Sequence, residues 1–180
     1  MQATDELRAE HEGIKVMLGV METVCRRAEP ADPADLHKIV EFLSVFADRC
    51  HHGKEEDLLF PALEAAGVPR DGGPIGVMLE EHTRGRELIG AMRDALSEWD
   101  ADPARARAGF ASSALAYAAL LRDHIEKENT VLFAAADRLL SPSLDHELFE
   151  GFEGIERDRI GVGKHEEFHA LMDALAAKYQ

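Results

Sequence analysis

The chain has 180 residues, 46% of them hydrophobic and only seven of them proline, so it is long enough to bury one substantial core. Its formal net charge of -15 disfavours binding to nucleic acid or to an anionic membrane surface. Alternating Val/Ile/Thr runs and Asn-Gly hairpin turns are absent from the sequence, which leaves helix as the only regular structure that it supports. We therefore expect a single all-α protein.

The sequence has no apolar run near the roughly 18 residues that a membrane span requires, and residues 1–13 lack the apolar region of a signal peptide. We expect a cytoplasmic protein. Cys25 and Cys50 lie in helical apolar patterns and form no CxxC pair, so we expect reduced, buried thiols with a structural role.

Proline and glycine residues divide the chain into six predicted helices, because proline suits the first turn of a helix and glycine its end. The first four cover residues 4–28, 33–66, 74–98 and about 103–140. A fifth begins at Pro142, and a break at Gly161 and Gly163 precedes the sixth. We expect residues 1–140 to form the main bundle and residues 141–180 to form a helical extension packed on the same domain.

Histidines lie within the apolar stripes of the first and third predicted helices. His11 falls in the stripe of the first helix, which consists of Leu7, Ile14, Leu18, Met21 and Cys25. His82 falls in the inward-facing set of the third helix, which consists of Met78, Gly85, Ile89, Met92 and Leu96. Both imidazoles are therefore predicted to face the centre of the bundle.

The second and fourth helices share a His-x-x-x-Glu pattern. His51 precedes Glu55, and His124 precedes Glu128, by four residues, which is a turn of only about 40 degrees on an α-helix. Each helix then presents an imidazole and a carboxylate on one face, and this mixed donor set suits iron, manganese or zinc at the centre of a bundle. The candidate metal ligands are His11, His51, Glu55, His82, His124 and Glu128.

The heights of these residues along their helices agree with one shared site. His11 and His51 each lie about 17 residues, or roughly 25 Å, from the loop that joins their helices, so they meet in an antiparallel pair. His82 and His124 match less well, by about 7 Å, which the connecting loop must absorb.

A lone histidine on an amphipathic helix is more often hydrogen-bonded or solvated than a metal ligand, and we give His37 and His146 that interpretation. The six candidates together are different, because unpaired buried carboxylates cost several kcal/mol. One alternative remains open at this point. His52 and Glu56 have the same four-residue spacing, and they lie about 100 degrees around the helix from His51 and Glu55.

The stretches HHGKEEDLLFPAL and HIEKENTVLF resemble the second-helix and fourth-helix signatures of the hemerythrin-like, or HHE cation-binding, family. The resemblance covers residues 4–140 and implies an up-down-up-down four-helix bundle with a two-iron centre. It also implies that Glu55 and Glu128 bridge the two metals, that the four histidines are terminal ligands, and that His51 with Glu55 is the correct register.

The sequence departs from oxygen-carrying hemerythrins on the third helix, where Met78 or Arg86 stands in place of a second histidine. This departure counts against reversible oxygen carriage. A substitute ligand could come from water, and the candidate residues are His52, His165, His169 and, as a weaker one, Glu156. Tyr117 shares the inward face of His124, where core packing is the favoured role over a hydrogen bond near the metals or redox chemistry.

Three classes of function follow from these observations. The leading hypothesis is a di-iron protein, with manganese or zinc as alternative metals, that binds or senses oxygen, nitric oxide or peroxide or handles iron. The second is a di-iron oxidase or peroxidase of the ferritin-like type, which the His-x-x-x-Glu spacing argues against, because that type uses Glu-x-x-His pairs. The third is a metal-free helical interaction protein.

Overall fold

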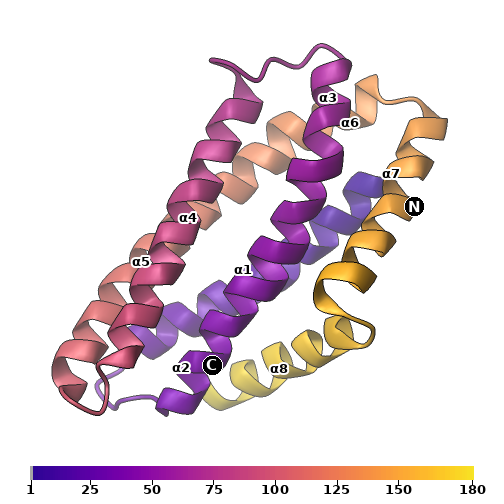
Figure 1. Ribbon diagram of the computed structural model, residues 1–180. Helices are drawn as coiled ribbons and strands as arrows, with labels where there is room; N and C mark the ends of the chain where they lie inside the picture. The colour runs from indigo at the N-terminus through magenta and orange to yellow at the C-terminus, as the bar shows by residue number, and fades with distance from the viewer. Residues whose placement is uncertain (1) are drawn as a thin grey trace.

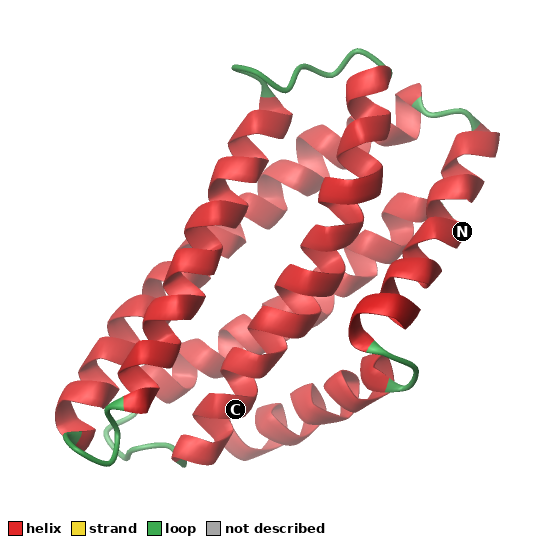
Figure 2. Ribbon diagram, in the orientation of Figure 1, coloured by secondary structure: helices red, strands yellow, loops and turns green. Residues whose placement is uncertain are grey.

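The computed structural model describes residues 2–180, and within that range helices are the only regular secondary structure (Figures 1 and 2). Four segments, η1 to η4, are wider π-helical stretches inside longer helices. The elements in chain order are α1 (Ala3–Arg26), α2 (Pro33–Phe42), η1 (Leu43–His52), η2 (Glu55–Leu59), α3 (Phe60–Ala65), α4 (Pro74–Ser97), α5 (Pro103–Lys127), η3 (Glu128–Leu132), α6 (Phe133–Leu139), α7 (Pro142–Ile155), η4 (Glu156–Ile160) and α8 (Lys164–Tyr179).

These elements join into six continuous helices, and the first four form an antiparallel bundle. Helix α5 packs on both α1 and α4, and α2 packs on α4. The last two helices, α7 and α8, lie against α1, with α7 on the right and α8 along the bottom in Figure 1. The prediction of an all-α four-helix bundle with an additional C-terminal pair of helices is confirmed.

Side-chain caps fix where several helices begin. The carboxylate of Asp32 accepts a hydrogen bond from the backbone N–H of Ala34 at 2.9 Å, and Asp102 accepts one from Arg105 at 3.1 Å. Each capping residue precedes a proline at the first helical position, where no N–H is needed. The observed helices begin and end within two residues of the predicted boundaries.

The break before α8 requires glycine. Gly161 and Gly163 have φ angles of +93 and +83 degrees, in the left-handed region that side chains with a Cβ rarely adopt. The chain reverses there, so α8 returns along α1.

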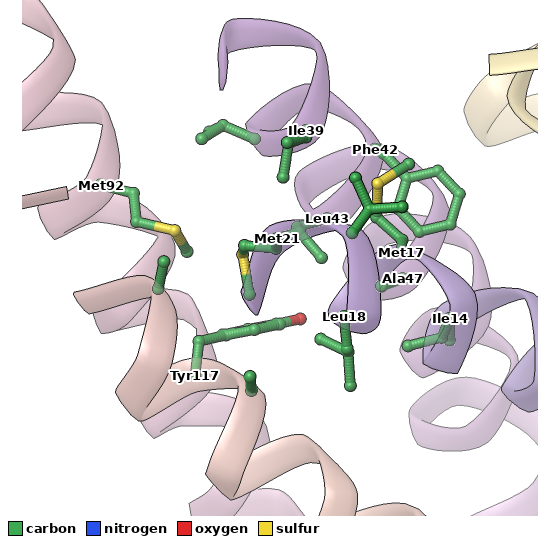
Figure 3. Close-up of a cluster of buried hydrophobic side chains, with 14 of the residues drawn as sticks. Ile14, Met17, Leu18, Met21, Ile39, Phe42, Leu43, Ala47, Met92 and Tyr117 are labelled. Atoms are coloured by element: carbon green, nitrogen blue, oxygen red, sulfur yellow. The ribbon is translucent and has the colours of Figure 1, made fainter. Parts of the chain in front are cut away.

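The apolar core is divided into two clusters by a layer of buried polar side chains. Along α1, Leu7 belongs to one cluster and Ile14 to the other, and His11 lies between them with no exposed surface. Figure 3 shows part of the larger cluster, in which Tyr117 of α5 lies among apolar side chains of α1 and α2. The polar layer thus occupies the middle of the bundle.

The two cysteines are both free thiols. Cys50 is fully buried, as expected, whereas Cys25 is only partly buried, because it lies in the last turn of α1 near the end of the bundle. Among residues 2–180, no helix combines the length and the apolar character that crossing a membrane requires.

Candidate metal centre

Seven side chains make up the polar layer at the centre of the bundle, and each of them is at most 2% exposed. They comprise the six predicted ligands and one further histidine, His52. Their donor atoms fall into two groups, in each of which the atoms lie within 4.8 Å of one another. The first, the three-histidine group, is His52, His82, His124 and Glu55, and the second, the two-histidine group, is His11, His51, Glu55 and Glu128.

Glu55 belongs to both groups and directs one oxygen at each. Its Oε1 lies 3.6 Å from Nε2 of His51 in the two-histidine group, and its Oε2 lies 3.5 Å from Nε2 of His82 in the three-histidine group. A carboxylate placed in this way can bridge two cations.

Glu128 has the same double orientation. Its Oε2 lies 3.2 Å from Nε2 of His11, and its Oε1 lies 3.2 Å from Nε2 of His124. The two carboxylates therefore connect the two groups from two different helices.

The five imidazoles in the layer share one arrangement, in which Nδ1 is held by an oxygen outside the layer and Nε2 points inward. The Nδ1 partners are Asn129 for His11 (3.0 Å), Glu10 for His51 (2.7 Å), Asp48 for His52 (3.3 Å), Glu56 for His82 (2.7 Å) and Glu81 for His124 (2.9 Å). Such partners fix the tautomer of a metal-binding histidine and raise its basicity.

The atoms that face the centre of the layer are largely without hydrogen-bond partners. Within residues 2–180, no partner is found for Nε2 of His11, His51 and His52 or for either oxygen of Glu55 and Glu128. Leaving buried polar atoms unpaired is costly, and a carboxylate costs more than a neutral group. The donor set therefore fits metal cations at the centre.

The protonation states of the buried histidines and carboxylates also favour metal binding at the centre of the layer. Burial lowers the pKa of His51 well below its usual range and that of His52 to about 3, helped by the neighbouring imidazoles, so both are neutral metal-binding forms. Burial, together with the carboxylate of Glu128, raises the pKa of Glu55. Burial also opposes the charge on His124, but Glu128 and Glu81 outweigh it and raise its pKa to about 9. A proton on His124 thus balances charge that a cation would otherwise balance.

His51 and His52 both face the layer, at a place where the helix is locally π-helical. In an α-helix, adjacent side chains are about 100 degrees apart, so helical spacing alone makes the two histidines alternatives. Segment η1 ends at His52 and η2 begins at Glu55, and the wider π turn allows both rings to face the layer. Glu56, the carboxylate of the alternative register, belongs to neither group and instead accepts a hydrogen bond from Nδ1 of His82.

Of the candidate substitute ligands, His52 lies in the polar layer, in the three-histidine group. His165 and Glu156 lie 3.4 Å apart on the C-terminal extension, outside both groups, and His169 belongs to neither group. His37 and His146 are exposed, as expected. The adjacent pair of histidines followed by glutamate was the signal in the sequence, and helical spacing alone left the two histidines as alternatives.

Comparisons with known proteins agree with this geometry. The family model described as the hemerythrin HHE cation-binding domain matches residues 2–136. The chain is 29% identical over 177 residues to the uncharacterized protein Rv1995 of Mycobacterium tuberculosis (strain H37Rv) and to the uncharacterized protein Mb2018 of Mycobacterium bovis. Each match covers 97% of this chain and 68% of the relative. No solved structure matches the chain significantly.

Proposed function

Because the chain belongs to the hemerythrin HHE cation-binding domain family, we propose that it is a non-haem di-iron protein that binds or senses a small molecule such as oxygen, nitric oxide or peroxide. One observation carries the proposal: Glu55 and Glu128 each direct one oxygen at a two-histidine group and the other at a three-histidine group. Five imidazoles with two carboxylates suit iron, and manganese and zinc are the alternative metals.

The two groups differ in the number of donors that they offer. Counting both shared carboxylates, the three-histidine group has five donors and the two-histidine group has four. Fewer protein donors leave more coordination positions open to a small molecule. We therefore assign the small-molecule position to the side of His11 and His51.

Bound iron would supply reversible ligand binding and electron exchange at this position. The protein's own contribution is to orient the imidazoles and to exclude water. The ring of Phe133 stacks on His11 with centroids 5.2 Å apart, and Phe60 stacks near His82 at 5.9 Å, so apolar rings border both groups. This environment strengthens electrostatic interactions within the layer.

The proposal is tested by metal content, measured by mass spectrometry, together with the optical spectrum of the aerobically purified protein. We expect two irons per chain and oxo-to-iron charge-transfer bands, and we expect the double variant His51→Ala, Glu55→Ala to lose both. The matched control is His37→Ala, Glu41→Ala, which removes an exposed His-x-x-x-Glu pair from the same long helix. Absence of stoichiometric metal after iron supplementation, or metal retained in the first variant, would contradict the proposal.

A second experiment tests whether the protein binds or senses a small molecule. The reduced protein is mixed anaerobically with nitric oxide, and in separate samples with oxygen and with hydrogen peroxide, and the optical spectrum is recorded. We expect a saturable spectral change at one position per chain. An iron-loaded protein whose spectrum responds to none of the three small molecules, peroxide included, would leave metal binding intact and overturn the binding or sensing role.

A further inference from the structure

Lys54 is a fully buried lysine beside the metal centre. Its ammonium contacts three carboxylates, Glu6 at 2.5 Å, Glu10 at 2.6 Å and Glu156 at 2.6 Å. Glu156 is the first residue of η4 and lies outside residues 2–136, the part that the family model matches. The C-terminal extension thus reaches a charged cluster inside the bundle.

One carboxylate connects this cluster to the polar layer. Oε1 of Glu10 contacts the Lys54 ammonium, and its Oε2 lies 2.7 Å from Nδ1 of His51, a member of the two-histidine group. A continuous series of contacts therefore runs from Glu156 through Lys54 and Glu10 to His51.

The other carboxylates that hold imidazoles are paired differently. Asp48 and Glu56 both form ion pairs with Arg86, and Glu81 forms one with Lys127. Arg86 and Lys127 belong to the main bundle, and their side chains are about 40% exposed. Of these three cations, Lys54, which pairs with Glu10, is the one that is buried and that also contacts the extension. Through these ion pairs, the extension can therefore affect the histidines of the two-histidine group and not those of the three-histidine group.

We propose that Glu156 is a positioning residue for the metal centre, which acts through Lys54 and Glu10 on His51 and so sets the metal affinity of the two-histidine group. This inference rests on the proposed function, because it requires a metal at that group. It gives the C-terminal extension a specific role at the side where we place the small molecule.

The physical step is the sharing of one ammonium among three carboxylates. His165 and Lys54 hold the pKa of Glu156 at about 2, so Glu156 is charged at neutral pH. When its charge is removed, Lys54 interacts more strongly with Glu10, and Glu10 becomes a weaker acceptor for the N–H of His51. A less polarised imidazole is a weaker metal ligand.

The test compares Glu156→Gln with wild type by titrating the metal-free chain with cobalt(II) and recording the visible spectrum at each step. We expect one of two binding steps to weaken by roughly 3- to 10-fold, less than the 10- to 100-fold typical of a residue that contacts the ligand directly. We also expect the spectrum of that step to shift. The matched control is Glu153→Gln, one turn earlier in the same helix, exposed and without an ion pair in the described part of the chain.

A wild-type chain that binds two cobalt ions and a Glu156→Gln variant with the same affinities and spectra would overturn the inference while leaving the proposed function intact. A wild-type chain that binds fewer than two ions contradicts the proposed function itself. A change of equal size in Glu153→Gln would mean that general surface charge, and not the contact with Lys54, is responsible, and it would also overturn the inference.

A double-mutant cycle tests whether Glu156 acts on His51 through Lys54. In the Lys54→Met background, Glu156→Gln is expected to have a smaller effect on the weakened step, because the contact through Lys54 is gone and only the direct interaction between the Glu156 and Glu10 carboxylates, whose oxygens lie within 4.8 Å, remains. Additive effects would contradict the route through Lys54. If Lys54→Met does not fold, Glu156→Asp takes its place: it keeps the charge and is expected to restore most of the affinity, and no restoration would count against the inference.

Discussion

Some buried ionisable side chains in this protein have hydrogen-bond partners and others have none. Lys54 is fully buried and contacts three carboxylates, whereas Glu55 and Glu128 are fully buried and their oxygens have no hydrogen-bond partner within residues 2–180. Burying carboxylates whose oxygens lack hydrogen bonds is destabilising by several kcal/mol, and the imidazoles 3.2 Å from Glu128 offset this only in part, so the chain retains both carboxylates at a cost to its own stability. The polar layer is therefore best explained by cation binding and not by folding.

Tyr117 carries another buried polar atom, but it lies among apolar side chains (Figure 3). Its hydroxyl has no hydrogen-bond partner in the described residues. Because an unpaired buried hydroxyl is destabilising, Tyr117→Phe is expected to raise the free energy of unfolding by about 1 kcal/mol. Urea denaturation monitored by circular dichroism measures this change.

The control is the other tyrosine of the chain. Tyr179 donates a hydrogen bond to Asp35 at 2.7 Å, so Tyr179→Phe is expected to lower the free energy of unfolding, by about 1 kcal/mol. A destabilised Tyr117→Phe variant, or one whose iron-loaded protein has an altered spectrum, would instead show that the Tyr117 hydroxyl bonds to a bound molecule.

Residue spacing in the sequence predicted six of the seven members of the polar layer, and the structure brings all six together. Their prediction was possible because His-x-x-x-Glu and the apolar stripes specify one face of a helix. His52 remained an alternative, because its position depends on a local departure from α-helical geometry. The carboxylates that hold the imidazoles, such as Glu10 and Glu81, come from other helices, and helical spacing alone does not identify such partners.

At the scale of elements, three of the four π-helical segments coincide with the polar layer. Segment η1 ends at His52, η2 begins at Glu55 and η3 begins at Glu128. π-Helical turns are rare and occur frequently at functional sites. No composition or periodicity in the sequence marks such a turn, which explains why the helix ends were predicted within two residues and the internal π segments were missed.

Gly151 of α7 lies close to the side chain of Leu58 in η2. A Cβ added at Gly151 would lie 2.8 Å from Cδ1 of Leu58, closer than ordinary packing allows. Gly151→Val is therefore expected to force α7 away from η2 and to lower the free energy of unfolding by about 1 to 3 kcal/mol. Chemical denaturation measures the change.

Gly90 provides the matched control within α4. A Cβ at Gly90 would meet nothing within 4 Å, so Gly90→Ala is expected to raise the free energy of unfolding by about 0.5 to 1 kcal/mol through its helix propensity. Equal stability of Gly151→Val and wild type would show that Leu58 moves aside without cost and that the close approach is not required.

At the scale of the whole molecule, ion pairs join the C-terminal extension to the bundle at two distant places. Near its middle, Glu156 pairs with Lys54 and Arg159 pairs with Asp57, and at its end Lys178 pairs with Asp35. The sequence predicted the two extra helices, and their assignment as residues 141–180 packed on the same domain stays a prediction. The pairs themselves join residues more than 100 positions apart, and helical periodicity carries no information about contacts at that separation.

Asp35 makes the attachment of α8 dependent on pH. Burial opposes the charge of its carboxylate, but hydrogen bonds from Lys178, Tyr179 and Lys38 outweigh burial and lower its pKa to about 2. The pKa of an unfolded aspartate is about 3.9, so this carboxylate stabilises the fold above about pH 4, and the contribution disappears as the pH falls towards 2.

Asp35→Asn is therefore expected to lower the free energy of unfolding at pH 7 by about 1 to 2 kcal/mol, a value reduced from the full shift because Lys178 is half exposed. The difference from wild type is expected to shrink between about pH 4 and pH 2, measured by urea denaturation with chelator present throughout so that metal loss does not contribute. Asp123→Asn, which removes an exposed carboxylate without an ion pair in the described residues, is the control and should match wild type at every pH. A difference that stays constant from pH 7 to pH 2 would mean that Asp35 stabilises α8 through packing and not through its charge.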